Sequence, residues 1–259
     1  MTTEFLNPLR RVWARGDVAI NGWIAAPSII TTEAMGAGRW DALTVDLQHG
    51  TADYASLLTL LPVIEKSGAA PLVRVPWLDE GIVMRVLDAG AMGVIAPMID
   101  TPEDAARLVH ACLYAPRGGR SFGPVRARLA WGNDYPNRAN DEVLPLAMVE
   151  TKRAVEALDE IVAVPGLGGI YIGPADLSLS HGFAPGFDRE EPEMVKIILG
   201  ILEKCQAAGL RCCLHCGTVE YAIKMAPRGF SMVTVSSDAR FVEAAATSTV
   251  GRFREGMKR

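Results

Sequence analysis

The sequence lacks the features that mark several classes of protein. It has no apolar run long enough for a signal peptide at its N-terminus or for a membrane span further along. It has no block of Lys and Arg, and its formal net charge is only -4 at pH 7, so nothing would attract nucleic acid or an anionic membrane. We therefore expect a cytoplasmic protein whose partner is a small molecule.

Cysteine usage argues against disulfides and against a zinc site. The five cysteines are an odd number without the spacing of a disulfide framework, so we expect reduced thiols. One cluster, CCLHC at residues 212–216, resembles a soft metal site in composition. On a strand, however, Cys213 and His215 would point to one face and the other three side chains to the opposite face. The cluster therefore cannot converge on one ion.

The order of apolar segments predicts the fold. Short β-branched runs alternate with longer amphipathic segments, which is typical of βα units around a parallel sheet. A doubly wound sheet is the alternative, but no G-x-G-x-x-G loop follows the first strand. We predict a single (β/α)8 barrel over residues 1–259, with one long irregular loop at about 116–141. The eight predicted strands span residues 19–25, 42–48, 70–76, 93–99, 144–150, 168–174, 211–217 and 231–238.

Polar side chains cluster at the ends of four predicted strands, where barrel enzymes carry their chemistry. Asp46 and His49 follow the second strand, and Arg74 lies on the third. Glu150 ends the fifth strand, and Asp176 follows the sixth. Singly, each residue has an ordinary explanation as a helix cap, an ion pair or a packed histidine. Together they place acids, a base and a cation on one rim.

The two carboxylates predict a metal site. Glu150 and Asp176 stand on adjacent βα units, with no histidine or cysteine beside them. Oxygen ligands of this kind suit a hard divalent ion, Mg²⁺ or Mn²⁺, with Co²⁺ as an alternative. We therefore expect a two-carboxylate site with coordination positions left for a substrate.

Six motifs resemble one known family over nearly the whole chain. In order they are VDLQHG, VRVPW, AGAMGVIAPM, PRGGRSFGP, MVETKRAV and YIGPADLSLSHG. Their order and spacing resemble the HpcH/HpaI aldolases, which are metal-dependent class II pyruvate aldolases of the phosphoenolpyruvate/pyruvate barrel superfamily. The resemblance implies a divalent-metal cofactor and a homo-oligomer, with a hexamer favoured. GPADLS and VET together are its most specific motifs.

The resemblance also implies roles for individual residues. His49 matches the family's proton-transferring base, and Arg74 its transition-state arginine. Glu150 and Asp176 match its two metal ligands. The backbone of Gly173, Pro174 and Ala175 matches the cradle for the pyruvate carboxylate.

Two acids could tune the histidine. Asp88 matches a family acid that raises the basicity of His49, and Asp46 is the nearer candidate in sequence. Asp88 closes a predicted helix, so it should lie at the opposite end of the barrel and act through a neighbouring subunit or indirectly. Where many family members carry Gln, this chain has Met148, which removes an amide that could hydrogen-bond the substrate or water. Trp23 is a candidate for shaping the pocket, although barrel packing would also explain it.

The expected reaction is reversible cleavage of a 4-hydroxy-2-oxo acid into pyruvate, or a close 2-oxo acid, and an aldehyde. The metal and Arg74 would stabilise the enolate, while His49 would remove the 4-hydroxyl proton. Oxaloacetate decarboxylation through the same enolate is a close alternative, as is a non-catalytic barrel that binds 2-oxo acids. A Schiff-base aldolase would need a strand lysine, and only Lys152 is near a strand end. A metal hydrolase is disfavoured because the four histidines form no H-x-H or H-E-x-x-H pair.

Overall fold

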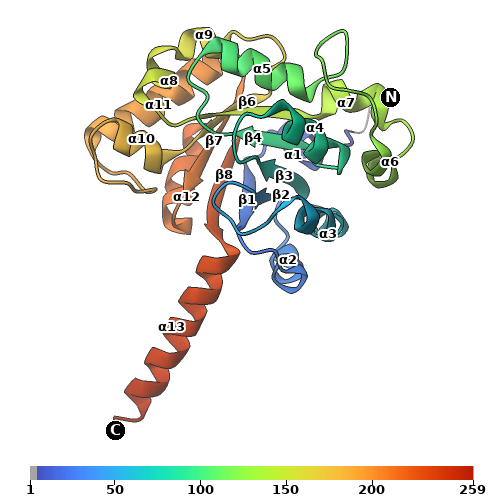
Figure 1. Ribbon diagram of the computed structural model, residues 1–259. Helices are drawn as coiled ribbons and strands as arrows, with labels where there is room; N and C mark the ends of the chain where they lie inside the picture. The colour runs from blue at the N-terminus through green and yellow to red at the C-terminus, as the bar shows by residue number, and fades with distance from the viewer. Residues whose placement is uncertain (1–4, 259) are drawn as a thin grey trace.

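The computed structural model describes residues 5–258, so the first four residues and the last one of the predicted domain lie outside it. Eight parallel strands close into a barrel in chain order, which confirms the predicted (β/α)8 fold (Figure 1). The strands are β1 (Ala19–Ile24), β2 (Ala42–Asp46), β3 (Ala70–Arg74), β4 (Gly93–Ala96), β5 (Leu144–Val149), β6 (Gly169–Ile172), β7 (Arg211–Cys216) and β8 (Met232–Ser237).

Helices follow the strands and surround the barrel. Most begin where a Ser, Thr, Asp or Asn side chain accepts a hydrogen bond from the first turn, as Asp53 and Thr101 do. The helices are α1 (Pro8–Ala14), α2 (Ile29–Gly36), α3 (Tyr54–Ser67), α4 (Glu80–Asp88), α5 (Pro102–Cys112), α6 (Val125–Trp131), α7 (Tyr135–Glu142), α8 (Lys152–Glu156), α9 (Leu158–Val162), α10 (Pro174–Ser180), α11 (Pro192–Ala207), α12 (Val219–Met225), the short 3₁₀ turn η1 (Ala226–Arg228) and α13 (Asp238–Gly256).

The strands bury side chains on both faces. One apolar cluster lies between the strands and the helices, and a second fills the barrel, where Trp23, Tyr171 and Cys213 pack together. Cys212 and Cys216 belong to the outer cluster, so strand β7 shows the predicted alternation. All five cysteines are free and buried.

The segment at 116–141 is not one irregular loop, which corrects the sequence prediction. It contains α6 and most of α7. Tyr135 and Ala139, one helical turn apart, are buried together with Met92 and Ala127. The sequence hid this helical face because the residues around it are mostly Asn, Asp, Arg and Pro, whose pattern is typical of a loop.

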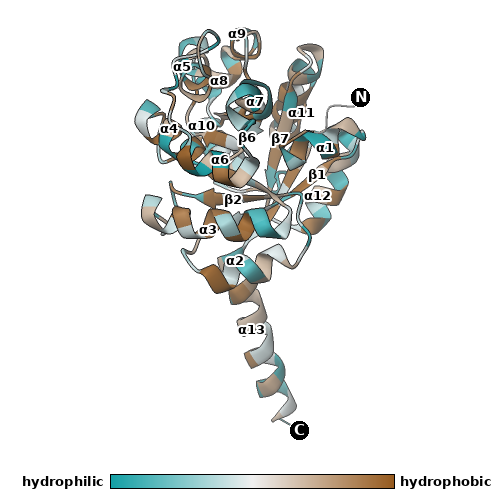
Figure 2. Cartoon of the chain, turned by 90° about the vertical axis from the view of Figure 1, so that its right-hand side faces the viewer, coloured by the Kyte–Doolittle hydropathy of each residue, from teal (hydrophilic) through white to brown (hydrophobic). Residues whose placement is uncertain are grey.

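The last helix, α13, stands clear of the barrel (Figures 1 and 2). Its first turn lies beside α2, where Phe241 packs 6.3 Å from Trp40 between ring centroids. Beyond that turn large apolar side chains are exposed, with Phe253 68% and Met257 70% accessible. Within residues 5–258 we find no helix with the length and apolar character needed to cross a membrane.

Candidate active site

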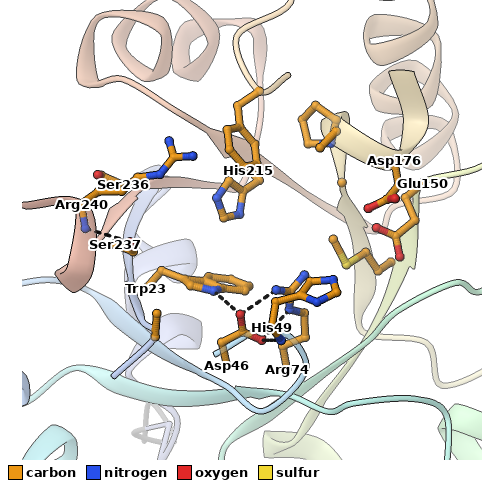
Figure 3. Close-up of a pocket in the computed structure, with 16 residues that line it drawn as sticks. Trp23, Asp46, His49, Arg74, Glu150, Asp176, His215, Ser236, Ser237 and Arg240 are labelled. Atoms are coloured by element: carbon orange, nitrogen blue, oxygen red, sulfur yellow. Dashed lines mark hydrogen bonds and ion pairs between the residues drawn. The ribbon is translucent and has the colours of Figure 1, made fainter. Parts of the chain in front are cut away.

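One cavity of about 390 Å³ opens at the carboxyl ends of the strands (Figure 3). It collects nearly all the residues that the sequence singled out. Strand-end positions alone explain this convergence, because the carboxyl ends of parallel strands meet on one rim of the barrel. The predicted residues that line it are Trp23, Asp46, His49, Arg74, Glu150, Gly173, Pro174, Ala175 and Asp176.

Arg74 is held by Asp46 on the neighbouring strand. Nε donates to Oδ1 at 2.9 Å and Nη2 donates to Oδ2 at 2.7 Å, which is the two-point geometry that fixes a guanidinium plane. The side chains of Arg74 and Asp46 are only 11% and 4% exposed. The Trp23 ring lies 5.0 Å from the guanidinium carbon, and its Nε1 donates to Asp46 Oδ2 at 3.1 Å. Trp23 therefore both packs in the barrel and supports the site.

The Asp46 carboxylate is the acceptor in a set of hydrogen bonds from side chains and backbone. Besides Arg74 and Trp23, the backbone N–H groups of Gln48 and His49 donate to Oδ1 at 3.0 and 3.3 Å. Burial by itself would raise the pKa of Asp46, but the hydrogen bonds and charge of Arg74 outweigh it, and the pKa lies below its usual value. Asp46 is therefore a charged support for Arg74. None of these contacts involves the imidazole of His49.

His49 lies in the turn after β2, at the rim of the cavity. Its side chain is exposed, and the structure gives its imidazole no hydrogen-bond partner among the described residues. Gly50 follows it for a steric reason, because a Cβ there would approach the carbonyl oxygen of Asp46 to 2.3 Å. The turn thus places the imidazole where its ring nitrogens can hydrogen-bond a molecule bound in the cavity.

Glu150 and Asp176 form the acidic side of the cavity (Figure 3). Glu150 is 2% exposed, and its Oε1 accepts from the backbone N–H of Met98 at 2.8 Å. Burial is the main reason that the pKa of Glu150 rises to about 7, and the charge of Asp176 adds to the rise. A buried carboxylate beside a second one lacks a compensating cation, and a divalent ion would supply it. The donor set therefore fits a hard metal ion.

Gly173 is required by the approach of Glu150. A Cβ at this position would meet Glu150 Oε2 and Met148 Cε, each at 2.5 Å. Only glycine leaves room for the buried carboxylate and for the start of α10 beside it. Met148 is 4% exposed and makes this corner of the cavity apolar.

Within residues 5–258, no three His, Cys, Asp or Glu side chains gather in a way that could hold a metal ion. On strand β7, Cys212 and Cys216 lie in the outer apolar cluster, whereas Cys213 lies inside the barrel. The acidic pair would hold a metal with two protein ligands and leave the remaining positions open.

The chain is similar to known proteins over most of its length. The HpcH/HpaI aldolase/citrate lyase family model matches residues 22–243. The chain belongs to this family. A hydroxypyruvate/pyruvate aldolase of Rhizorhabdus wittichii is 40% identical over 249 residues, which are 96% of this chain and 99% of that protein. A second protein of the same name, from Agrobacterium fabrum, is 36% identical over 226 residues, covering 86% and 84% of the two chains.

A solved structure agrees with these sequence matches. An HpcH/HpaI aldolase/citrate lyase family protein from Burkholderia cenocepacia superposes with a TM-score of 0.87 at 28% identity, over 96% of this chain and 99% of that one. The family and its named members make this protein an aldolase, a carbon–carbon lyase.

In this aldolase Asp88 is not part of the cavity of its own chain. It ends α4, and its Oδ1 accepts from Arg120 Nη2 at 2.6 Å. Arg120 in turn donates to the Tyr135 hydroxyl at 3.1 Å. Asp88 therefore anchors α4 to the 116–141 segment in the single chain. Its influence on His49, through a neighbouring subunit or indirectly, stays a prediction.

No lysine lines the cavity among the described residues, and Lys152 is exposed at the start of α8. Sequence reasoning missed several residues that do line it: Phe187, His215, Ser236, Ser237 and Arg240. His215 was predicted to share a face with Cys213, and the end of that face opens into the site. Phe187 lies in the segment between α10 and α11, and no local pattern marks it.

Proposed function

We propose that this aldolase is divalent-metal dependent and reversibly cleaves 4-hydroxy-2-oxo acids into pyruvate, or a close 2-oxo acid, and an aldehyde. The observation that carries the proposal is the cavity in which a fixed arginine, a free histidine, the buried Glu150 and the exposed Asp176 face one another. Cleavage of the C3–C4 bond leaves an enolate, so a catalyst must stabilise negative charge on the 2-oxo oxygen and remove the 4-hydroxyl proton.

Arg74 would stabilise the enolate oxygen. Asp46 engages Nε and Nη2, which leaves Nη1 without a hydrogen bond to the described residues and available to a substrate oxygen. Because Asp46 and Trp23 hold the guanidinium before substrate arrives, little reorganisation is needed as charge develops. The backbone N–H groups of Ala175 and Asp176, in the first turn of α10, have no intrahelical acceptor and would bind the substrate carboxylate.

Glu150 and Asp176 would hold Mg²⁺ or Mn²⁺, with Co²⁺ as an alternative. A bound divalent ion supplies Lewis-acid polarisation of the 2-oxo group. The chain's own contribution is to bury Glu150 against the N–H of Met98 and to keep Gly173 free of a side chain, so that Oε2 stays accessible.

His49 would take the 4-hydroxyl proton in cleavage and return it in condensation. An imidazole can both accept and donate a proton, so the same side chain can serve as base in cleavage and as acid in condensation. Its exposed position at the rim also lets it exchange that proton with water between turnovers.

The helix α13 supports the proposal that the protein is a homo-oligomer, with a hexamer favoured by resemblance. Val242, Val250, Phe253 and Met257 are all exposed and fall on one stripe of the helix at 100° per residue. In proteins most helical stability comes from packing of an apolar face, and an exposed apolar stripe of this kind marks an interaction surface. A second copy of the chain is the occupant that we propose, and any direct approach of Asp88 to another subunit's His49 would require such an assembly.

The activity is tested by incubating the protein with pyruvate or hydroxypyruvate, a panel of aldehydes and Mg²⁺, Mn²⁺ or Co²⁺, while following consumption of both partners. We expect paired consumption that needs the metal. Loss of the 2-oxo acid without loss of aldehyde would indicate a different reaction, and no turnover with any pair would contradict the proposal.

A further inference from the structure

His215 extends from the end of β7 into the cavity, and the proposed chemistry leaves it without a role (Figure 3). Its ring stacks on Phe187 at 4.8 Å between centroids and meets Trp23 edge-on at 5.0 Å, so two aromatic side chains fix its plane. Its Nδ1 lies 2.9 Å from the Tyr171 hydroxyl. The structure gives Nε2 no hydrogen-bond partner among the described residues. Whether Nε2 is a donor or an acceptor depends on which ring nitrogen carries the proton.

A chain of buried groups leads from His215 into the barrel. The Tyr171 hydroxyl lies 2.7 Å from the Thr234 hydroxyl, which in turn lies 2.9 Å from the side-chain amide of Asn21. Tyr171, Thr234 and Asn21 are at most 1% exposed, so water cannot supply or remove hydrogen-bond partners along the chain.

Asn21 sets the direction of every hydrogen bond in this chain. Its amide is satisfied when Nδ2 donates to the backbone oxygens of Gly22 and Ala42, at 3.2 and 3.1 Å, and Oδ1 accepts from Thr234 at 2.9 Å. Thr234 has a single hydroxyl proton and commits it to Asn21, so its oxygen must accept from Tyr171.

Tyr171 has then used its own proton, and its oxygen must accept from Nδ1–H of His215. A neutral imidazole carries one ring proton, so Nε2 faces the cavity as a lone pair. The surroundings keep the ring neutral. Burial, followed by the charges of Arg74 and Arg240, lowers the pKa of His215 to about 3, against a smaller opposing influence of Asp46.

We propose that His215 Nε2 accepts a hydrogen bond from a hydroxyl of the aldehyde, and that His215 thereby selects hydroxylated aldehydes over alkyl ones. The occupant of this position must be a donor, and the nearby positive charges of Arg74 and Arg240 disfavour an ammonium group. The aldehyde is the partner concerned, because the 2-oxo acid is assigned to the Glu150 side of the cavity. This inference rests on the proposed aldolase function and adds a specificity determinant to it.

The test compares glycolaldehyde with propanal, which has nearly the same shape without the hydroxyl, as partners for pyruvate. We expect the wild-type protein to prefer glycolaldehyde in kcat/KM by about 5- to 100-fold, as for a site that loses one hydrogen bond with the alkyl analogue. His215→Phe retains an aromatic ring between Phe187 and Trp23 but lacks the acceptor. It should lose the preference, because kcat/KM should fall much further with glycolaldehyde than with propanal.

Two further variants separate selection from packing. His215→Gln restores an acceptor and should recover part of the preference. Tyr171→Phe keeps the imidazole but removes the acceptor for Nδ1–H, so the preference should weaken. Nitrogen-15 NMR of histidine-labelled protein, with His215 signals assigned by their absence in His215→Phe, should show a protonated Nδ1 and a bare Nε2 at pH 7.

Distinct results would overturn distinct claims. An unchanged preference in His215→Phe, or a proton on Nε2, would overturn the role of His215 while the aldolase activity stands. An absence of condensation with both aldehydes in the wild-type protein would overturn the proposed function itself, and the role of His215 with it.

Discussion

Replacing Asp46 by Asn is the perturbation that most sharply separates two roles for this acid. The two carboxylate oxygens receive five donors: two from Arg74, one from Trp23 and two backbone N–H groups. An Asn amide has one oxygen and one NH₂ group, so in either orientation the NH₂ faces at least two donors. The substitution therefore removes the counter-charge of Arg74 and also displaces its guanidinium.

The expected losses follow from burial of the pair. Because the Arg74 side chain is only 11% exposed, removal of its partner should lower the free energy of unfolding by about 3 kcal/mol. Displacing a transition-state donor costs ~10²- to 10³-fold in rate, and we expect kcat to fall by that factor while KM changes less. The assays are urea unfolding and steady-state cleavage of a 4-hydroxy-2-oxo acid.

A double-mutant cycle tests the reasoning. If Asp46 acts by holding Arg74, then Asp46→Asn should cost less than about 10-fold in a protein that already carries Arg74→Ala. Equal losses in both backgrounds would show that Asp46 acts directly on the substrate or on His49, and the positioning role would be wrong.

Three further predictions concern other parts of the molecule. His49→Ala should slow aldol cleavage by ~10²- to 10⁴-fold but largely spare oxaloacetate decarboxylation, which releases no hydroxyl proton; equal losses in kcat/KM would mean another base. The pKa of His215 is about 3 in the folded chain and ~6.5 in the unfolded chain, so the unfolded state binds more protons between these pH values. The free energy of unfolding should therefore fall as the pH drops below 6.5, by about 2 kcal/mol at pH 5. Urea unfolding at pH 7.5 and 5.0 checks this, and His215→Phe should lack that share of the pH dependence. Phe253→Asp should dissociate the oligomer in light scattering, whereas Glu255→Ala should not; an unchanged mass for Phe253→Asp would remove α13 from the interface.

The sequence predicts the barrel well because its local signals agree. Each strand is a short apolar run that is buried on both faces, and the turn and cap residues between runs mark the helices. The predicted strand-end residues meet in one cavity for the same reason, since parallel strands place their carboxyl ends on one rim. Helices α6 and α7 escaped prediction because their buried face is only a few residues wide.

Features that depend on distant contacts could not be predicted from local patterns. The direction of the hydrogen bonds from Asn21 to His215 depends on how β1, β6, β7 and β8 align, for example on the pairing of His215 with Thr234. The hydrogen bond from the Met98 N–H to Glu150 comes from a residue with φ of 55°, and a methionine in the sequence does not indicate that conformation. Hexamer formation, the influence of Asp88 on His49 and a cytoplasmic location stay predictions.

Metal dependence of carbon–carbon bond cleavage tests the proposed function most directly. The measurement is the rate of pyruvate release from a 4-hydroxy-2-oxo acid after exhaustive chelation, and again after addition of Mg²⁺, Mn²⁺ or Co²⁺, in the wild-type protein and in Glu150→Gln. We predict that chelation abolishes the rate, that at least one of these ions restores it in the wild-type protein, and that restoration fails or needs far more metal in the variant. Full activity after chelation, together with covalent trapping of pyruvate by borohydride, would contradict the metal-dependent mechanism.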